Sequence, residues 1–303
     1  MLEIVVETEN WERHVRASAE ELAGLIRRIG GEGDRFLVVQ RVPDLPGVFA
    51  QVWHENGGGY EVEHRDGAGQ FQARAGGPEA VITAITGWAR QEPGWDAGLD
   101  FSPLDLAPAA EAPPLDLADD ERTQLEERVR EALTGGYASR SQLTELAEEF
   151  LVTEDRRPVS REQAAALVDR LWLERVAEQA TWRGETDPER LTRAFGALQE
   201  SGITARENFT CCRTCGQDEI GAEAAPDARG YVYFHSQCTE AAAAGHGLRL
   251  LFGGFDGSAD TTTAVGQEVV TALEAAGLQV EWNRDPGRAI AVTPLEWRRR
   301  LVG

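Results

Sequence analysis

The sequence contains no lysine, so all 30 of its basic residues, histidine aside, are arginines. Schiff-base catalysis and phosphate binding of the P-loop or kinase type depend on a lysine amine, so these functions lack their central residue. The chain also lacks an apolar run long enough for a transmembrane helix. Its first residues, MLEIVVETENWER, do not have the pattern of a signal peptide. We therefore expect a cytoplasmic protein whose four cysteines are reduced.

Positive charge is scarce relative to negative charge. There are 52 aspartates and glutamates, and the formal net charge is −22. A nucleic-acid-binding protein needs a basic surface that releases counterions from phosphates, so this composition argues against DNA or RNA as a partner. It also argues against binding to an anionic membrane surface. A basic protein partner is compatible with the charge, and the 42% apolar content is enough for a folded core.

The first 91 residues have the pattern of an antiparallel sheet with flanking helices. Apolar and polar residues alternate as in strands, and the connectors PDLPG, ENGGG and DGAG predict tight turns. Ser18 followed by Glu21 is a capping box, which marks the start of a helix. The predicted strands are 2–8, 35–41, 48–54, 60–65 and 70–74, and the predicted helices are 18–28 and 78–91. We therefore expect an α+β module over 1–91.

The rest of the chain divides into a linker and a second module. Residues 92–118 hold five prolines and six acidic residues but no basic residue, which is typical of an extended linker. Helices are predicted at 119–134, 139–151, 160–182, 187–201, 237–244 and 262–276, and strands at 230–235, 247–252, 278–282 and 289–293. Short amphipathic helices need a surface to cover. We therefore expect residues 119–303 to form one domain, in which a helical segment leads into a second α+β fold.

Cysteine and histidine residues give the strongest chemical signal in the sequence. Cys212 and Cys215 form a C-x2-C pair, and His235 and Cys238 form an H-x2-C pair. Because a C-x2-C turn directs two thiolates at one ion, two such pairs predict a tetrahedral zinc site with all four residues as ligands. Structural zinc is one interpretation, and inert buried thiols, redox-active thiols and a catalytic metal are the others.

Cys211 gives the sequence a fifth donor, which a closed site with three cysteines and one histidine does not need. It is therefore a candidate reactive thiol. An enzyme or redox sensor that acts through Cys211, Cys212, Cys215 and His235 stays open as an alternative. Two specific enzyme classes are not supported, because the sequence has neither the zinc-deaminase order of H-x-E before P-C-x-x-C nor the G-x-S-x-G turn of serine hydrolases.

Acidic side chains near the ENGGG turn are candidates for contacts with a protein partner. Glu61 and Glu63 lie on one face of the predicted strand 60–65, and Glu55 lies in the loop 55–59. Alternating carboxylates are also typical of the solvated face of a half-buried sheet. We take Glu55, Glu61 and Glu63 as the predicted contact residues for a basic protein.

From about residue 119 to 303 the sequence resembles a bacterial family of unknown function. The matching segments are LWLERVAEQATW (171–182), AFGALQESGITARENFTCCRTCG (194–216), GYVYFH (230–235) and VEWNRDPGRAIAV (280–292). The resemblance implies no assigned activity. Members of this family often carry an acidic residue where this chain has Cys238, so the resemblance favours Cys211, Cys212, Cys215 and His235 as the ligand set.

Residues 1–100 are similar to immunity proteins of bacterial polymorphic-toxin systems, through the hairpins around FAQVWHENGGGYEVEHRDG (49–67) and the helix that ends in ITGWARQ (85–91). The resemblance implies binding to a cognate toxin domain, and many such toxins are basic nucleases that an acidic protein complements. We therefore predict a non-enzymatic, acidic binding protein with a zinc-stabilised C-terminal domain and a basic partner such as a toxin domain. The alternative is a thiol- or metal-dependent enzyme or redox sensor.

Overall fold

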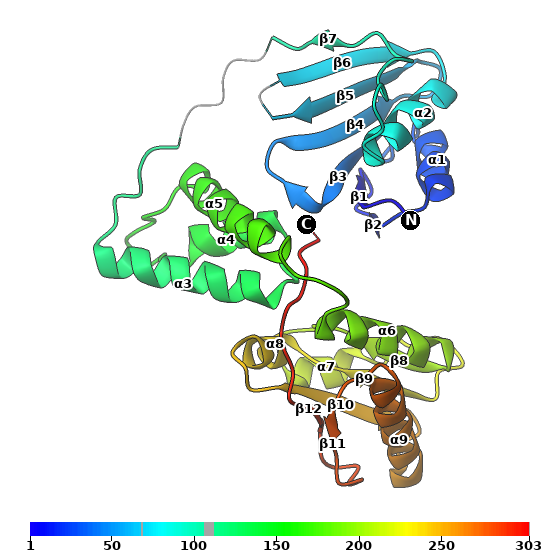
Figure 1. Cartoon of the computed structure of the whole chain (residues 1–303), viewed down its shortest axis with the longest axis vertical. Helices are drawn as coiled ribbons and strands as arrows, with labels where there is room; N and C mark the ends of the chain where they lie inside the picture. Colours follow the sequence, from blue (N-terminus) through cyan, green and yellow to red (C-terminus); the bar gives the residue numbers. More distant parts are fainter. Residues whose placement is uncertain (68, 106–111, 303) are drawn as a thin grey trace. The chain divides into compact units, whose positions relative to one another are not determined.

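The computed structural model describes residues 1–67, 69–105 and 112–302, and these residues form an α+β fold with two compact units (Figure 1). The first unit comprises Met1–Arg122, Ser139–Val176 and the last residues from Arg300, and the second comprises Thr123–Ala138 and Ala177–Arg299. The predicted fold class is confirmed, because an antiparallel sheet with helices is followed by a helical segment and a second, mixed sheet. The two units divide the chain differently from the predicted segments 1–91, 92–118 and 119–303. Those segment boundaries stay a prediction.

The first unit is built on a seven-stranded sheet in which neighbouring strands are antiparallel. The strands are β1 (Ile4–Thr8), β2 (Arg13–Val15), β3 (Phe36–Leu45), β4 (Val48–His54), β5 (Tyr60–Asp66), β6 (Gly69–Ala75) and β7 (Ser102–Pro103), in the order β2-β1-β3-β4-β5-β6-β7. Alternate residues point to opposite faces, so Val39, Ala50 and Val62 all lie in the core with no exposed surface. The strands predicted from alternation are present, whereas β2 and β7 are too short to show alternation.

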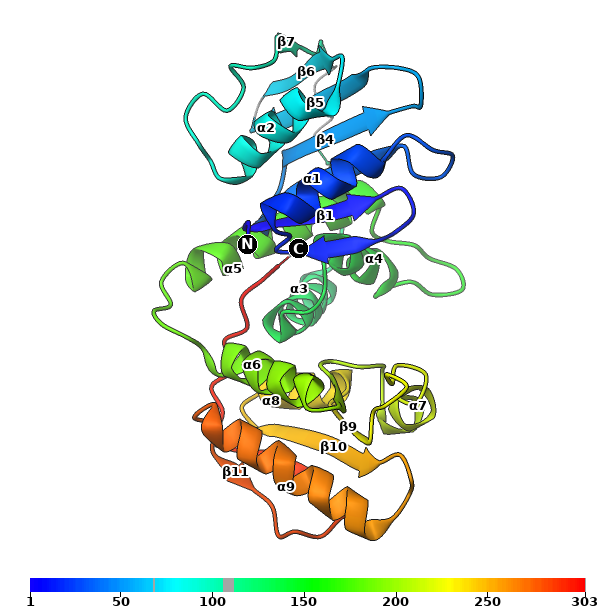
Figure 2. The same ribbon diagram turned by 90° about the vertical axis from the view of Figure 1, so that its right-hand side faces the viewer.

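Helices α1 (Ala19–Arg28) and α2 (Pro78–Ala89) pack side by side on one face of this sheet (Figure 2). The predicted capping box at the start of α1 is confirmed: the Ser18 hydroxyl accepts a hydrogen bond from the Glu21 N–H at 3.0 Å, and the Glu21 carboxylate accepts one from the Ser18 N–H. Apolar side chains from the segment after α2 pack against the same core, namely Trp95, Leu99 and Phe101. The apolar face of the sheet is therefore covered by α1, α2 and this segment.

Helix α4 (Arg140–Glu149) and most of α5 (Arg161–Gln179) belong to the same unit. Asp44, near the end of β3, connects both helices to the sheet. Its backbone C=O accepts a hydrogen bond from Trp172 Nε1 at 2.7 Å, and its carboxylate accepts one from Arg140 Nε at 2.5 Å. Asp44 and Trp172 are buried. These contacts join residues more than ninety positions apart in the chain, which explains why α4 and α5 group with the N-terminal sheet.

The second unit combines helices with a five-stranded sheet in which β8 and β9 are parallel and the other pairs are antiparallel. Its helices are the later part of α3 (Asp119–Gly135), α6 (Asp187–Glu200), α7 (Arg213–Glu219), α8 (Ser236–Ala243) and α9 (Ala259–Ala275). Its strands are β8 (Ile203–Arg206), β9 (Gly230–Tyr233), β10 (Leu248–Gly254), β11 (Val280–Glu281) and β12 (Ile290–Val292), in the order β11-β12-β10-β9-β8. No helix in the described ranges is both long enough and apolar enough to cross a membrane.

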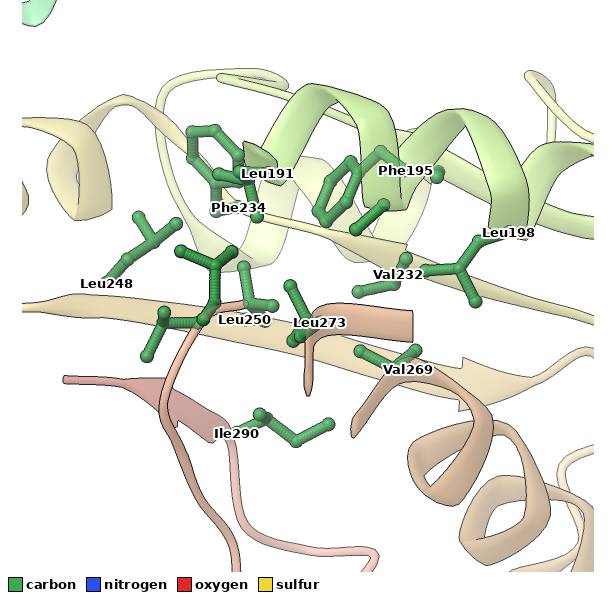
Figure 3. Close-up of a cluster of buried hydrophobic side chains, with 14 of the residues drawn as sticks. Leu191, Phe195, Leu198, Val232, Phe234, Leu248, Leu250, Val269, Leu273 and Ile290 are labelled. Carbon is green, nitrogen blue, oxygen red and sulfur yellow. The ribbon is translucent and has the colours of Figure 1, made fainter. Parts of the chain in front are cut away.

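The core of the second unit lies between α6, α9 and the sheet (Figure 3). Leu191, Phe195 and Leu198 recur at three- and four-residue spacing along α6, as an amphipathic helix requires. All three are at most 2% exposed. The same cluster contains Phe234 and Cys238, so this core reaches the segment that carries the predicted H-x2-C pair.

A partly buried polar cluster anchors the chain just after β8. Tyr137 Oη donates a hydrogen bond to Glu207 Oε2 at 2.6 Å, and Arg299 Nη1 lies 2.9 Å from the same oxygen. The Arg299 guanidinium also lies over the Tyr137 ring, 3.8 Å from its centroid. Burial raises the pKa of Tyr137 well above its usual range, so the hydroxyl stays protonated and donates. The loop that follows Glu207 therefore starts from a fixed point.

Candidate metal centre

The loop that carries the cysteines is held against the connection between β9 and α8. The Phe209 N–H donates to the Phe234 C=O at 2.8 Å, and the Ser236 N–H donates to the Thr210 C=O at 3.2 Å. The Ser236 hydroxyl also donates to the Cys211 C=O at 3.0 Å. Thr210 has a φ of +61°, a left-handed turn that redirects the chain into α7. The segments that carry the C-x2-C and H-x2-C pairs therefore run side by side.

Three thiols converge at the end of this loop. Cys211 is exposed, Cys212 is the N-cap of α7, and Cys215 lies in its first turn. The Cys215 Sγ lies 3.6 Å from the Cys211 Sγ and 3.7 Å from the Cys212 Sγ, and all three sulfur atoms lie within 4.8 Å of one another. Thiolates bound at about 2.3 Å to a tetrahedral zinc ion lie about 3.8 Å apart. The donor type and the spacing therefore fit a group that could hold a metal ion.

The electrostatics of the thiols depend on their mutual contacts. The backbone N–H of Cys215 donates to the Cys212 thiolate, and this bond, followed by contacts with the neighbouring thiols, holds the pKa of Cys212 below its usual range. Hydrogen bonding to Cys211 and then to Cys212 raises the pKa of Cys215 to about 11. Opposite shifts arise because three adjacent thiols resist the accumulation of negative charge. A bound cation would remove that conflict, since metal binding releases the thiol protons.

Tyr233 and Gly216 fix α7 beside the sheet. Tyr233 Oη donates to the Arg213 C=O at 3.1 Å, and burial raises the pKa of Tyr233 to about 12, which keeps the hydroxyl a donor. A Cβ atom added at Gly216 would lie 2.4 Å from the Tyr233 ring. Neither residue belongs to a ligand motif in the sequence, so neither was predicted to support the site. The features that mark them in the sequence are the alternating aromatic residues of GYVYFH and the glycine that directly follows Cys215.

His235 and Cys238 lie at the start of α8 and form a second group of donor atoms. The His235 Nε2 lies 3.5 Å from the Cys238 Sγ, and the two residues are 8% and 9% exposed. Burial, followed by the charge of Arg213, lowers the pKa of His235, so the imidazole is neutral near pH 7. Its Nδ1 is buried and bonds to none of the residues that the structure describes. Over those same residues, the three-thiol group does not extend to His235 or Cys238.

The predicted ligands are therefore brought together in two neighbouring groups rather than around one point. Cys211, Cys212 and Cys215 form the first group, and His235 and Cys238 form the second. A group of three thiols that could hold a metal is present, while the complete ligand set and the identity of the metal stay predictions. Cys211, predicted as an extra thiol beside the site, lies within the first group.

Two of the predicted partner-binding glutamates, Glu61 and Glu63, lie on the sheet face that points away from α1 and α2, and Glu55 lies in the turn that follows β4. Glu55 and Glu61 line a pocket of about 220 Å³ that also contains Trp53 and Arg74. Trp53 is 38% exposed, and Glu61 Oε1 pairs with Arg74 Nη2 at 2.7 Å. Glu63 instead accepts hydrogen bonds from two glutamine side chains on the adjacent strands, at 2.7 and 2.9 Å. Two of the three predicted residues thus share one pocket, and the third bonds within the sheet.

Comparison with known proteins adds a family but no activity. The family model described as Domain of unknown function (DUF6891) matches residues 118–301, a range that contains the whole thiol group. No curated protein and no solved structure matches the chain. The match confirms the C-terminal resemblance to a family of unknown function. The similarity of residues 1–100 to immunity proteins stays a prediction.

Proposed function

The chain belongs to the DUF6891 family, which has no assigned function, and we propose that its second unit is a zinc-binding module held by Cys211, Cys212 and Cys215. The observation that carries this proposal is the convergence of the three sulfur atoms, whose 3.6 and 3.7 Å separations are close to the edge of a zinc–thiolate tetrahedron. Because unfolded chains rarely contain a preformed metal site, the ion would stabilise this unit. The ion would then have a structural role in a non-enzymatic binding protein.

We further propose His235 as the fourth ligand. Its Nδ1 is a buried nitrogen without a described partner, which costs free energy unless something binds it. Its neighbour Ser236 is hydrogen-bonded to Thr210 and Cys211, so the imidazole is attached to the same loop as the thiols. Metal binding would draw Nδ1 towards the three sulfurs and close a site of three cysteines and one histidine.

Metal analysis of protein purified without a histidine tag tests the zinc site. We expect about one equivalent of zinc per chain, as for a single tetrahedral site. Serine variants of Cys211, Cys212 and Cys215 should each lose most of it, because a hydroxyl is a poor zinc ligand. Cys238→Ser is the matched cysteine control and should retain the ion. His235→Ala should weaken binding, whereas the exposed His246→Ala should not. A wild-type protein that stays metal-free after incubation with zinc chloride refutes the proposal.

The same thiols support the alternative of a redox sensor or thiol-dependent enzyme in the metal-free state. Cys211 is exposed, and the pKa of Cys212 is lowered by the Cys215 N–H, which favours a reactive thiolate. Thiol titration with and without a chelator separates the two functions. Thiols that react quickly only after chelation support the structural metal, whereas one fast thiol in the metal-loaded protein supports thiol chemistry.

A second proposed function, independent of the metal, is binding of a basic protein such as a toxin domain by the first unit. The pocket lined by Trp53, Glu55 and Glu61 combines an exposed aromatic ring with carboxylates, which suits an arginine or lysine side chain. The neighbouring Glu63 contributes negative charge to the same sheet face.

Calorimetric titration with an arginine-rich peptide tests this pocket. Trp53→Ala and a Glu55→Gln/Glu61→Gln double variant should each weaken binding, because they remove the ring and the charges. Glu20→Gln, an exposed change on α1, is the control and should bind like the wild type. Equal binding by all variants would show that the attraction is only nonspecific charge. Protection of cells from co-expressed basic toxins then tests the biological role.

A further inference from the structure

We propose that Cys238 is a positioning residue that orients the His235 ring for metal binding, and that it is not itself a ligand. This inference rests on the proposed zinc site. The observation behind it is the 3.5 Å contact between Cys238 Sγ and His235 Nε2, made by two residues that are both more than nine-tenths buried. The contact occupies one ring nitrogen and leaves the other, Nδ1, with no partner in the described part of the chain.

The backbone holds the two side chains in this relation. His235 is the N-cap of α8, and the Cys238 N–H donates to the His235 C=O at 2.9 Å, so the pair spans the first helical turn. Residues three apart in a helix face the same side. When Nδ1 binds a metal, the ring proton resides on Nε2, and the Cys238 sulfur is the acceptor within reach. Histidine ligands commonly donate their second ring N–H to such a partner, which fixes the tautomer and the ring orientation.

The surroundings of Cys238 suit this role better than direct ligation. Its side chain belongs to the apolar core with Phe234 and Leu250, whereas Cys211 is exposed and Cys215 is half-buried. Its sulfur lies outside the group of three thiols over all residues that the structure describes. The H-x2-C pair therefore differs in role from the C-x2-C pair. His235 is a metal ligand, and Cys238 orients it.

Chelator competition on the full-length protein measures the effect. Cys238→Val keeps the approximate size of the buried side chain but removes the hydrogen-bond acceptor, and should reduce zinc affinity by about 10- to 100-fold. Cys238→Ser and Cys238→Asp restore an acceptor, and the serine variant should regain most of the lost affinity. The melting temperature of each metal-free variant controls for damage to the core. Rescue by an acceptor is the signature that a role limited to packing would not produce.

A double-mutant cycle with His235→Ala makes the test specific. If Cys238 acts through His235, Cys238→Val should have no further effect on affinity once the imidazole is gone. The near-ultraviolet spectrum of the cobalt-substituted Cys238→Val protein should retain its full thiolate-to-cobalt charge-transfer intensity, because no thiolate ligand has been removed.

Four outcomes overturn the inference. Unchanged zinc affinity in Cys238→Val removes the positioning role. Loss of charge-transfer intensity as large as in Cys215→Ser identifies Cys238 as a ligand. Additive effects of the His235 and Cys238 changes show that the two residues act independently. If the wild-type protein binds no zinc, both this inference and the proposed function fail. The other three outcomes overturn the inference alone.

Discussion

At the scale of the residue, burial decides the charge state of His64. Its ring stacks on Phe71, with centroids 5.0 Å apart, and meets the edges of Trp95 and Phe101. Removal of the ring from water lowers the pKa of His64, because the charged imidazolium loses its hydration. Its Nδ1 is buried and bonds to no residue within the described ranges. The first unit therefore contains a histidine whose neutral form is favoured by folding.

This burial predicts a stability that depends on pH. The unfolded chain takes up a proton near its ordinary pKa of about 6.5, whereas the folded chain does so only at lower pH. Stability is therefore fully present above the unfolded pKa and is lost as the pH falls through the folded pKa. We expect the melting temperature of the wild type to fall between about pH 7.5 and about pH 5.5. His64→Phe should remove part of this slope, and the exposed His246→Phe should keep it. An identical slope in both variants would contradict the assignment.

At the scale of the element, local signals in the sequence predicted most of the helices and strands. Ser18 and Ser139 begin their helices with capping boxes, as the S-x-x-E/Q pattern indicates. The seven-residue helix α7 escaped prediction, because it is too short to display a helical period. The closeness of Cys212 and Cys215 could be predicted from their spacing within one turn. The side-by-side placement of their loop and α8 depends on the parallel pairing of β8 with β9, which no local pattern encodes.

The packing of α7 gives a second prediction, through Gly216. Gly216→Ala places a methyl group 2.4 Å from the Tyr233 ring and must displace the first turn of α7. We expect a destabilisation of about 1–3 kcal/mol, as for other overpacked sites, together with weaker zinc binding in the chelator assay. Gly196→Ala is the matched control, because Gly196 lies within α6 with no atom within 4 Å of an added Cβ. That change should stabilise by roughly 0.5–1 kcal/mol. Equal zinc affinity in both variants would show that the packing of α7 does not affect the metal site.

At the scale of the whole molecule, the proposed metal belongs to one unit only. The three thiols and His235 all lie within Ala177–Arg299, and β3 to β6 all lie within the other unit. A ligand that binds only the folded state stabilises that state by about 2.7 kcal/mol when its free concentration is 100 times its dissociation constant. Removal of the ion should therefore loosen the second unit and leave the first sheet unchanged.

Hydrogen exchange with mass spectrometry checks this third prediction. Chelation should accelerate amide exchange in the loop 207–212 and in α7 and α8, because these segments lose their common anchor. Exchange in β3 to β6 should stay the same and serves as the internal control. Acceleration throughout both units would mean that the metal supports the entire chain, and no change anywhere would argue against a structural ion.

The first sheet ends on both sides in very short strands, and this has a consequence for behaviour at high concentration. β2 has three residues and includes Arg13, while β7 has two and includes Pro103, which has no amide hydrogen to offer. Edge strands of two and three residues are too short to form a long ladder with a strand of another molecule, which disfavours edge-to-edge aggregation through β2 and β7.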